Sequence, residues 1–241
     1  MIEIRSLCAH AEFSEAVDLQ QKIWGFSDRD LFPERMFVVV SKTGGHILGA
    51  YRGKEMVGFC LAMPGFKPDG FPYWHSHMLA VLPEYRNSGV GRRMKLRQRE
   101  EASRRGIGLI EWTFNPLELK NAFFNIERLG AIVRRYVENQ YGPSSSLLDG
   151  GLPTDRCIAE WWITSPRVVS ALGGWRTTHH SEERISVPVD IARLREDEPE
   201  RAREIQRSNA ARFQDYFMRG LAVTGFARTP TEGVYFLEPW E

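Results

Sequence analysis

The chain has 241 residues, of which 42% are hydrophobic and 26% are charged, so its composition is that of a globular protein rather than a disordered one. Its net charge of +1 gives no general affinity for nucleic acid, and its three cysteines lack the spacing of a disulfide framework or a zinc site. The N-terminus has no apolar signal segment, and no apolar run reaches membrane length. We therefore expect a cytoplasmic protein with no membrane partner.

The N-terminal part of the chain is predicted to alternate short strands and helices. Alternating polarity after the first residue indicates a strand, and apolar residues at helical spacing up to Gly25 indicate a helix. A second helix or turn and a β-hairpin follow, and then a loop rich in glycine and proline. These elements are expected at residues 2–7, 13–24, 33–41, 46–51, 56–64 and 65–72.

A strand, a turn and a helix follow between Tyr73 and Arg105. The turn from Arg86 to Gly91 contains two glycines, and the segment after it is rich in helix-forming residues. Such a turn leaves backbone N–H groups directed outward at a helix N-terminus, which is an anion site. The turn is neither a dinucleotide fingerprint nor a P-loop. A tight turn before a solvated basic helix is the alternative interpretation.

The rest of the chain continues the α/β pattern. We expect strands at residues 108–114, 132–137 and 157–164, a helix at 116–128, and an exposed or mobile linker at 141–155. In the tail, strands are expected at 185–189, 221–226 and 234–237. Asp197 is the expected cap of a helix in which Ile205, Asn209, Phe213 and Phe217 form one stripe. This stripe should be buried, against the preceding domain, within a small lobe, or in a homodimer.

The segment Leu79-Ala-Val-Leu-Pro-Glu-Tyr-Arg86-x-x-Gly89-x-Gly91 closely resembles the acetyl-CoA signature of the GNAT acyltransferase superfamily. The resemblance implies an α/β (α+β) fold with a mixed central sheet flanked by helices over residues 1–165, and residues 166–241 would be a C-terminal α/β extension. It also implies that the strand carries the pantetheine arm and that the loop amides hold the pyrophosphate. The loop before this strand, 65–72, would be a substrate lip.

On this resemblance, the co-substrate is acetyl-CoA or a related acyl-CoA, and the motif does not choose the acyl group, so succinyl-CoA stays open. No metal is implied. Asn115 and Asn121 could contact the pantetheine or adenine end, or they could cap turns. The cofactor-binding candidates are Leu79, Ala80, Val81, Arg86, Asn87, Ser88, Gly89, Val90, Gly91, Arg92, Asn115 and Asn121.

His75 and His77 are the leading candidates for the general base. They are two residues apart on one strand, so they share a face, and imidazole is suited to base work near neutral pH. A similar His-x-His occurs in the arylalkylamine N-acetyltransferases. The alternatives are two structural histidines or a metal pair that lacks a third ligand. Glu111 on the next strand is a further base candidate, or else the partner of a basic side chain.

The acceptor side and the general acid are less defined. Many GNAT members have a tyrosine where this chain has Ile126, so Tyr136, Tyr141 or solvent would have to protonate the thiolate. Trp74 is a candidate substrate contact. Of Arg134 and Arg135, only one should face the cleft, because adjacent strand residues point in opposite directions. That arginine could clamp a carboxylate, or it could form a surface ion pair.

The sequence thus predicts an N-acyltransferase that moves an acyl group from acyl-CoA to the amine of a small molecule such as an amino acid. A non-catalytic acyl-CoA-binding regulator on the same fold is the alternative. A nucleic-acid binder is disfavoured, because the basic residues of the Arg92–Arg105 helix lie on all sides and no aromatic residues interleave them.

Overall fold

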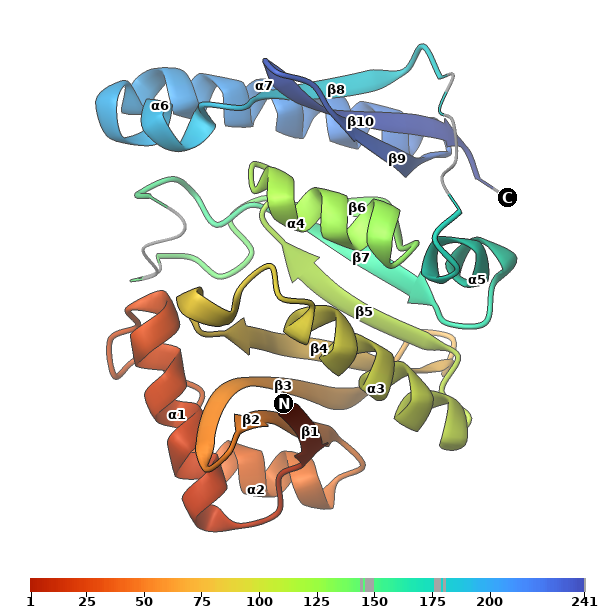
Figure 1. The fold of residues 1–241 in the computed structure, drawn as a ribbon. Coiled ribbons are helices and arrows are strands. Elements are labelled where there is room, and N and C mark those ends of the chain that lie inside the picture. The colour runs from red at the N-terminus through yellow and green to blue at the C-terminus, as the bar shows by residue number, and fades with distance from the viewer. Residues whose placement is uncertain (144, 146–149, 176–178, 180, 241) are drawn as a thin grey trace. The chain divides into compact units, whose positions relative to one another are not determined.

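A computed structural model describes residues 1–143, 145, 150–175, 179 and 181–240. The chain forms two compact units (Figure 1). The first contains residues 1–111 and Ser145, and the second contains residues 112–143 and the described residues from 150 onward. No helix in the described ranges is long and apolar enough to cross a membrane.

The first unit has the elements expected from the sequence. Its strands follow the order β1-β2-β3-β4-β5, in which β1 to β4 are antiparallel and β4 pairs in parallel with β5. Its elements are β1 (Ile2–Ser6), α1 (His10–Trp24), α2 (Glu34–Lys42), β2 (His46–Arg52), β3 (Glu55–Phe66), β4 (Pro72–Val81), the 3₁₀ turn η1 (Pro83–Tyr85), α3 (Val90–Arg104) and the start of β5 (Leu109–Phe114). The segment 33–41, left open between helix and turn, is therefore a helix.

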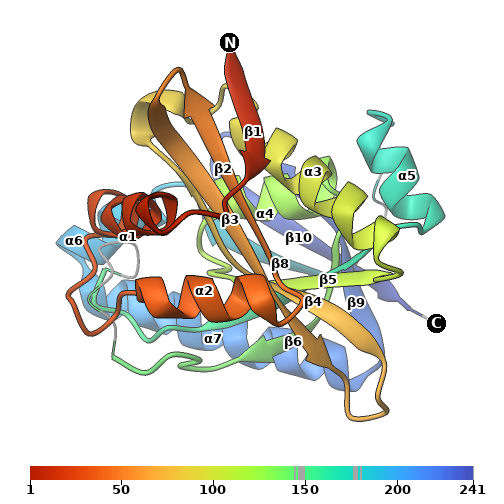
Figure 2. The same cartoon turned by 90° about the horizontal axis from the view of Figure 1, so that it is seen from below.

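The helices of the first unit cover both faces of its strands. α1 and α2 lie on one face and α3 lies on the other (Figure 2). Phe13 and Phe37 stack at 5.9 Å between ring centroids beneath α1 and α2. The buried Gln20 side chain bonds both the carbonyl and the N–H of Phe32, at 3.0 and 2.8 Å, which fixes the loop between the two helices. This loop places the Phe32 ring next to the candidate site.

Strand β4 alternates its exposure along its length, as the sequence predicts. Trp74, Ser76, Met78 and Ala80 are buried, whereas the residues between them are partly exposed. In the register with β3, Leu61 is opposite Met78 and Ala62 is opposite Ser76, so His77 is the extra residue of a β-bulge. A bulge re-aims the local side chain, and here it does so at a candidate catalytic position.

The second unit continues with the strand order β5-β7-β6-β9-β10-β8. After the end of β5 its elements are α4 (Leu119–Phe123), the π-helical turn η2 (Phe124–Arg128), β6 (Ile132–Val137), β7 (Arg156–Trp162), α5 (Pro166–Leu172), β8 (Arg184–Pro188), α6 (Ile191–Asp197), α7 (Pro199–Met218), β9 (Leu221–Arg228) and β10 (Glu232–Pro239). The predicted α/β class with a mixed sheet flanked by helices is confirmed. Helices α5 and α6 were not expected. Asp197 ends α6 rather than capping α7, whose N-cap is Glu198.

The tail belongs to the same compact unit as β6 and β7. Val133 of β6 pairs with Val223 of β9, and Phe213 of α7 stacks on Tyr136 of β6 at 5.4 Å between centroids. The helical stripe is therefore buried in part: Asn209 and Phe213 are buried, whereas Ile205 and Phe217 are partly exposed. The compact units divide at Glu111 rather than at Ser165, and the boundary at Ser165 stays a prediction.

The predicted linker at 141–155 is exposed only in part. Leu152, Thr154 and Asp155 are buried, and the Thr154 hydroxyl donates to the carbonyl of Gly142 at 3.1 Å. These contacts contradict the expectation of a uniformly exposed segment. Residues 144 and 146–149 of the linker lie outside the described part of the chain.

Candidate active site

The turn between η1 and α3 has the backbone geometry of an anion site. Gly89 is the N-cap of α3 with φ 84°, and Asn87 also has a positive φ of 62°. The N–H of Arg93 donates to the Gly89 carbonyl at 3.0 Å, which is the first bond of the helix. Within the described chain, the amide N–H groups from Asn87 to Gly91 have no hydrogen-bond partner. Their dipoles and the helix dipole together favour a bound anion.

The two glycines of this turn serve different purposes. Gly89 occupies a left-handed conformation that other residues adopt at a cost, although a Cβ there would meet nothing within 4 Å. Gly91 has no such φ, and a Cβ there would lie 3.8 Å from Leu79 and 3.9 Å from Val81, at ordinary contact distance. The protein itself therefore does not require glycine at position 91. A ligand that approaches the backbone would require it.

Side-chain hydrogen bonds hold this turn and the start of α3 in place. Arg86 Nε donates to the carbonyl of Val81 at 3.2 Å, which ties the turn to the end of β4. Arg93 Nη2 donates to the carbonyl of Ile2 at 2.8 Å, so it is directed toward β1. Ser88 Oγ donates to the carbonyl of Tyr85 at 2.5 Å. These bonds hold the turn in place without using its amide groups.

The two histidines of β4 share one face, as predicted. Their ring centroids are 5.8 Å apart, and the His77 ring lies 5.3 Å from that of Phe32. The partly exposed Leu79 and Val81 follow on the same face toward the turn. Within the first unit, β4 pairs with β5 at Trp74 and His75. The face thus combines two imidazoles with aliphatic side chains that lead to the turn.

Burial keeps both imidazoles neutral near pH 7. Burial, together with the nearby charges of His77, Lys95 and Lys67, lowers the pKa of His75 to about 4. Burial also lowers the pKa of His77 from its ordinary value. A neutral imidazole can accept a proton, as a general base must.

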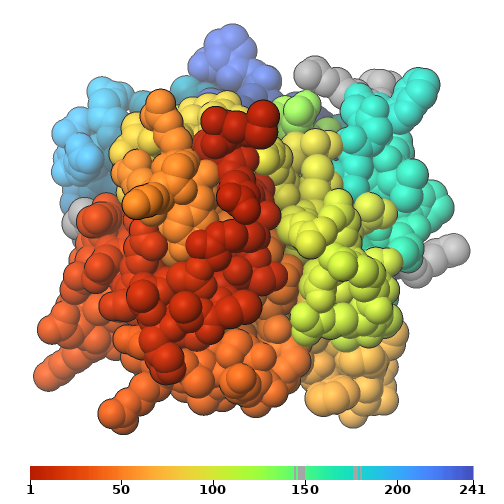
Figure 3. All heavy atoms as spheres, turned by 60° about the horizontal axis from the view of Figure 1, so that its bottom comes forward, coloured from red at the N-terminus to blue at the C-terminus, as the bar shows by residue number. Residues whose placement is uncertain are grey.

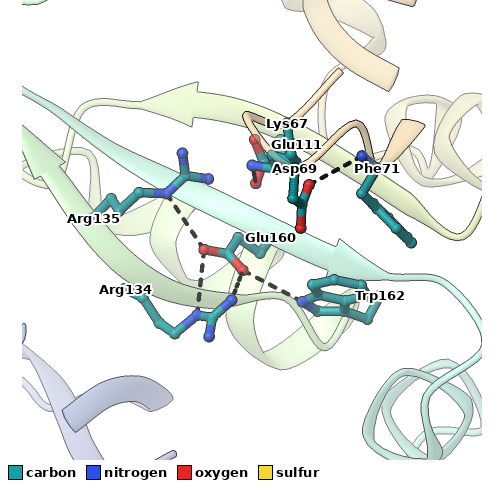
Figure 4. A network of polar contacts seen from close by, with 8 residues as sticks. All are labelled: Lys67, Asp69, Phe71, Glu111, Arg134, Arg135, Glu160 and Trp162. Atoms are coloured by element: carbon teal, nitrogen blue, oxygen red, sulfur yellow. Dashed lines mark hydrogen bonds and ion pairs between the residues drawn. The ribbon is translucent and has the colours of Figure 1, made fainter. Parts of the chain in front are cut away.

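Glu111 lies beside the histidines but is already paired. His75 is its partner in the parallel register between β4 and β5. Its side chain is 4% exposed and forms an ion pair with Lys67 of the β3–β4 loop (Figure 4). The Lys67 ammonium also lies 4.7 Å from the centroid of the Tyr73 ring. A carboxylate in such an ion pair is already engaged by its partner. The structure therefore favours the pairing role for Glu111.

In the second unit, Arg134 and Arg135 both bind the buried carboxylate of Glu160. Arg134 Nη2 lies 2.6 Å from Glu160 Oε2, and Arg135 Nε lies 3.5 Å from Glu160 Oε1 (Figure 4). The register between β6 and β7 shifts between Val133 and Arg135, and this irregularity overrides the alternation of side chains. Both arginines therefore contact Glu160, against the expected alternation of side chains. Which of them faces the cleft stays a prediction.

Two further candidates behave as structural residues. Trp74 is 1% exposed and stacks on His46 at 5.5 Å between ring centroids, on the α3 face of β4. Its predicted substrate contact is thus corrected, because the side chain is in the core. Asn115 is buried and accepts a hydrogen bond from the N–H of Leu117 at 2.9 Å, as a turn residue does. Asn121 is exposed on α4.

Comparisons with known proteins fit this geometry. Residues 11–130 match the family model described as acetyltransferase (GNAT) family. The chain is a member of the GNAT superfamily. No curated protein matches it.

Solved structures of GNAT proteins share the fold at low identity. The ribosomal-protein-S18-alanine N-acetyltransferase of Escherichia coli is 18% identical, with 68% of this chain and 96% of that chain covered and a TM-score of 0.53. Aminoglycoside 6'-acetyltransferase type Ii is 19% identical, with 68% and 98% covered and a TM-score of 0.54. A putative GNAT acetyltransferase of Desulfovibrio desulfuricans is 14% identical, with 68% and 100% covered and a TM-score of 0.52.

This GNAT protein departs from the usual pattern at its general acid. Ile126, in place of the usual tyrosine, is buried in the π-helical turn η2. Tyr136 is a poor replacement, because burial and its hydrogen bond to Asp155 raise its pKa well above the ordinary value. The Tyr141 hydroxyl is bonded to Thr113 Oγ1 at 2.7 Å in the second unit. Of the three proton sources expected for the thiolate, solvent is the one that remains.

The sequence reasoning missed a buried polar cluster behind β4. Lys95 is 2% exposed, and its ammonium donates to Ser76 Oγ at 3.0 Å and to Gln98 Oε1 at 2.9 Å. Burial lowers the pKa of Lys95 to about 8. The sequence of α3 is basic throughout, so Lys95 does not stand out in it. Its burial is indicated only by its position two helical turns before Ala102, which faces the core.

Proposed function

We propose that this protein is an N-acyltransferase that moves an acyl group from acetyl-CoA or a related acyl-CoA to the amine of a small molecule. One observation carries the proposal. A face with two neutral imidazoles leads along β4, through Leu79 and Val81, to a turn with unpartnered amides. A base and a pyrophosphate site on one strand and the turn that follows it are what acyl transfer from a CoA thioester needs.

The donor is proposed to bind along β4 and the turn. The amides from Asn87 to Gly91 would hold the pyrophosphate, with Arg92 in the first turn of α3. The backbone from Leu79 to Val81 would bond the pantetheine arm. The absence of a side chain at Gly91 fits this role. The conformation and surroundings of Gly91 would tolerate a side chain, so we attribute the glycine to the close approach of a ligand.

The proposed reaction is direct attack by the acceptor amine on the thioester carbonyl. His77 accepts a proton from the amine as the new C–N bond forms, directly or through water held by His75. The carbonyl oxygen becomes an oxyanion, which needs N–H donors, and the β4 backbone is their proposed source. Collapse breaks the C–S bond, and the CoA thiolate leaves and takes a proton from solvent. The products are an amide and CoA.

The acceptor is proposed to be a small amine, for example an amino acid. The amine of such a molecule would lie at the face of β4 that carries His75 and His77. Arg134 or Arg135, which both contact Glu160, is the proposed carboxylate clamp. Known GNAT structures include enzymes named for aminoglycosides and for a ribosomal protein, so the fold itself does not define the acceptor.

An acceptor screen tests the proposal. The protein is incubated with acetyl-, propionyl- or succinyl-CoA and a panel of amines, and the released thiol is measured together with the mass of the acylated product. We expect at least one amine to gain one acyl group and to release one CoA. Binding of CoA without acylation of any amine would contradict catalysis and would favour a regulator that binds acyl-CoA. The Gly91→Val variant is the matched control for donor-dependent turnover.

A further inference from the structure

The second unit contains a cavity that none of the roles above uses. It has a volume of about 280 Å³ and lies between residues of η2, the short helix α5, Trp175 and His179. Helix α5 is at the surface of the molecule (teal in Figure 3). The cavity is lined by Ile126, Glu127, Pro166, Arg167, Ser170, Ala171, Trp175 and His179. It is slightly smaller than typical pockets for drug-sized ligands, which are roughly 300–1,000 Å³.

A carboxylate is fixed on one wall of this cavity. Glu127 Oε1 accepts hydrogen bonds from the N–H of Phe226 at 2.8 Å and from His179 Nε2 at 3.0 Å. Oε2 of the same carboxylate has no hydrogen-bond partner among the described residues and is accessible to solvent. One oxygen of Glu127 is thus held by the protein, and the other is available to a ligand. A carboxylate held in this way loses little conformational entropy when it binds a cation.

A guanidinium is fixed on the same cavity in a similar way. Arg167 Nε donates to the carbonyl of Gly130 at 3.1 Å, and Nη2 donates to the carbonyl of Thr224 at 2.5 Å. Nη1 has no hydrogen-bond partner in the described chain and is accessible to solvent. Arg167 and Glu127 form no ion pair, although both line the cavity and the charge of Glu127 raises the pKa of Arg167 against the lowering effect of burial. The cavity thus presents two separate opposite charges.

Most of the remaining wall is apolar. Ile126, Pro166 and Ala171 contribute aliphatic surface, and Ser170 contributes one hydroxyl. Trp175 follows the Gly173-Gly174 turn that ends α5 and is 77% exposed. Its backbone N–H donates to the carbonyl of Ser170 at 3.2 Å. An exposed tryptophan that lines a cavity offers a large apolar contact to a ligand.

We propose that this cavity binds a small zwitterion, namely an α-amino acid with an apolar side chain. The ammonium group lies on Glu127 Oε2, the carboxylate lies on Arg167 Nη1, and the side chain packs on Ile126 and Trp175. Both charges of the ligand are needed, because each wall charge left unpaired against a bound ligand costs affinity. The proposal concerns binding in the absence of acyl-CoA, so it does not depend on the proposed transferase activity.

Calorimetric titration of the full chain with alanine, valine, leucine, methionine and phenylalanine tests this proposal. For the amino acid that binds best, the decarboxylated amine and the deaminated acid are titrated as half-ligands. We expect each half-ligand to bind at least about tenfold more weakly than the zwitterion, since each lost charge-assisted bond is worth that much. Absence of binding by all five amino acids, or equal binding of a half-ligand, would overturn the proposal.

Variants place the ligand in the cavity. Glu127→Gln keeps an acceptor for the N–H of Phe226 but removes the charge, and Trp175→Ala removes the exposed wall. Each should weaken the amino acid at least about tenfold. Glu200→Gln alters a carboxylate that is 84% exposed outside the cavity and should change nothing. Unchanged affinity in a folded Trp175→Ala protein would refute the site.

Discussion

Gly91 offers the sharpest separation of ligand binding from folding in this protein. In the Gly91→Ala variant the added methyl group would lie 3.8 Å from Leu79 and 3.9 Å from Val81, so no internal clash arises. Alanine also favours a helix over glycine by about 1 kcal/mol, so the free energy of unfolding should stay equal or rise slightly. Loss of one charge-assisted bond between a backbone amide and the pyrophosphate costs roughly 1.5–3 kcal/mol. The dissociation constant of CoA should therefore rise by about 10- to 150-fold.

Gly89 supplies the matched contrast, because its requirement is conformational. A Cβ there meets nothing within 4 Å, but its φ of 84° strains any other residue by roughly 1–2 kcal/mol. Gly89→Ala should therefore lower the free energy of unfolding, whereas Gly91→Ala should lower only the affinity for CoA. The assays are urea unfolding and calorimetric titration with CoA on both variants. Normal CoA affinity in Gly91→Ala, and also in the bulkier Gly91→Val, would refute the donor site.

Three further predictions concern the acceptor, the tail and the buried lysine. If Arg135 contributes to a carboxylate clamp, Arg135→Ala should remove any preference for amino acids over their decarboxylated amines, and kcat/KM ratios that do not change would contradict the clamp. A chain ending at Ser165 should be less soluble and less stable than the full chain, because it exposes the face of Tyr136 that Phe213 covers; equal stability in urea would show the tail to be dispensable. The pKa of Lys95 is lowered from 10.5 to about 8 by burial, so the unfolded state binds more protons between these values and stability should rise with pH there. Lys95→Met should lack this rise, and an identical pH dependence of the two proteins in urea would contradict the assignment.

The order of elements and the donor turn could be predicted from sequence because both depend on local signals. Bulky residues that end at a Pro-Glu-Tyr turn mark β4, and the two glycines mark the turn before α3. The shared face of His75 and His77 follows from the two-residue period of a strand. Local rules also locate Gly25, which ends α1 in a left-handed conformation.

Long-range pairing decided the features that the sequence did not indicate. The pairing of Lys67 with Glu111 joins a loop to a strand far along the chain, and local pattern carries no trace of it. The bulge at Arg134 turns both arginines toward Glu160 and defeats the simple alternation rule. Trp74 looked like a cleft aromatic, but whether an aromatic residue of β4 faces α3 or the histidines depends on register.

The most direct test of the acyl-transfer site is the pH dependence of kcat/KM for the wild type, His77→Ala, His75→Ala and the double variant. Because the pKa of His77 is lowered, its imidazole is neutral near pH 7 and loses its function as base only when pH falls through that lowered pKa. We predict that His77→Ala lowers kcat/KM by about 10²- to 10⁴-fold with CoA affinity nearly unchanged, and that the acid limb disappears. His75→Ala should cost less, and the two effects should not add if one water chain joins the rings. A double variant with near-normal kcat/KM and the wild-type pH profile would contradict the account and would leave Glu111 as the leading base.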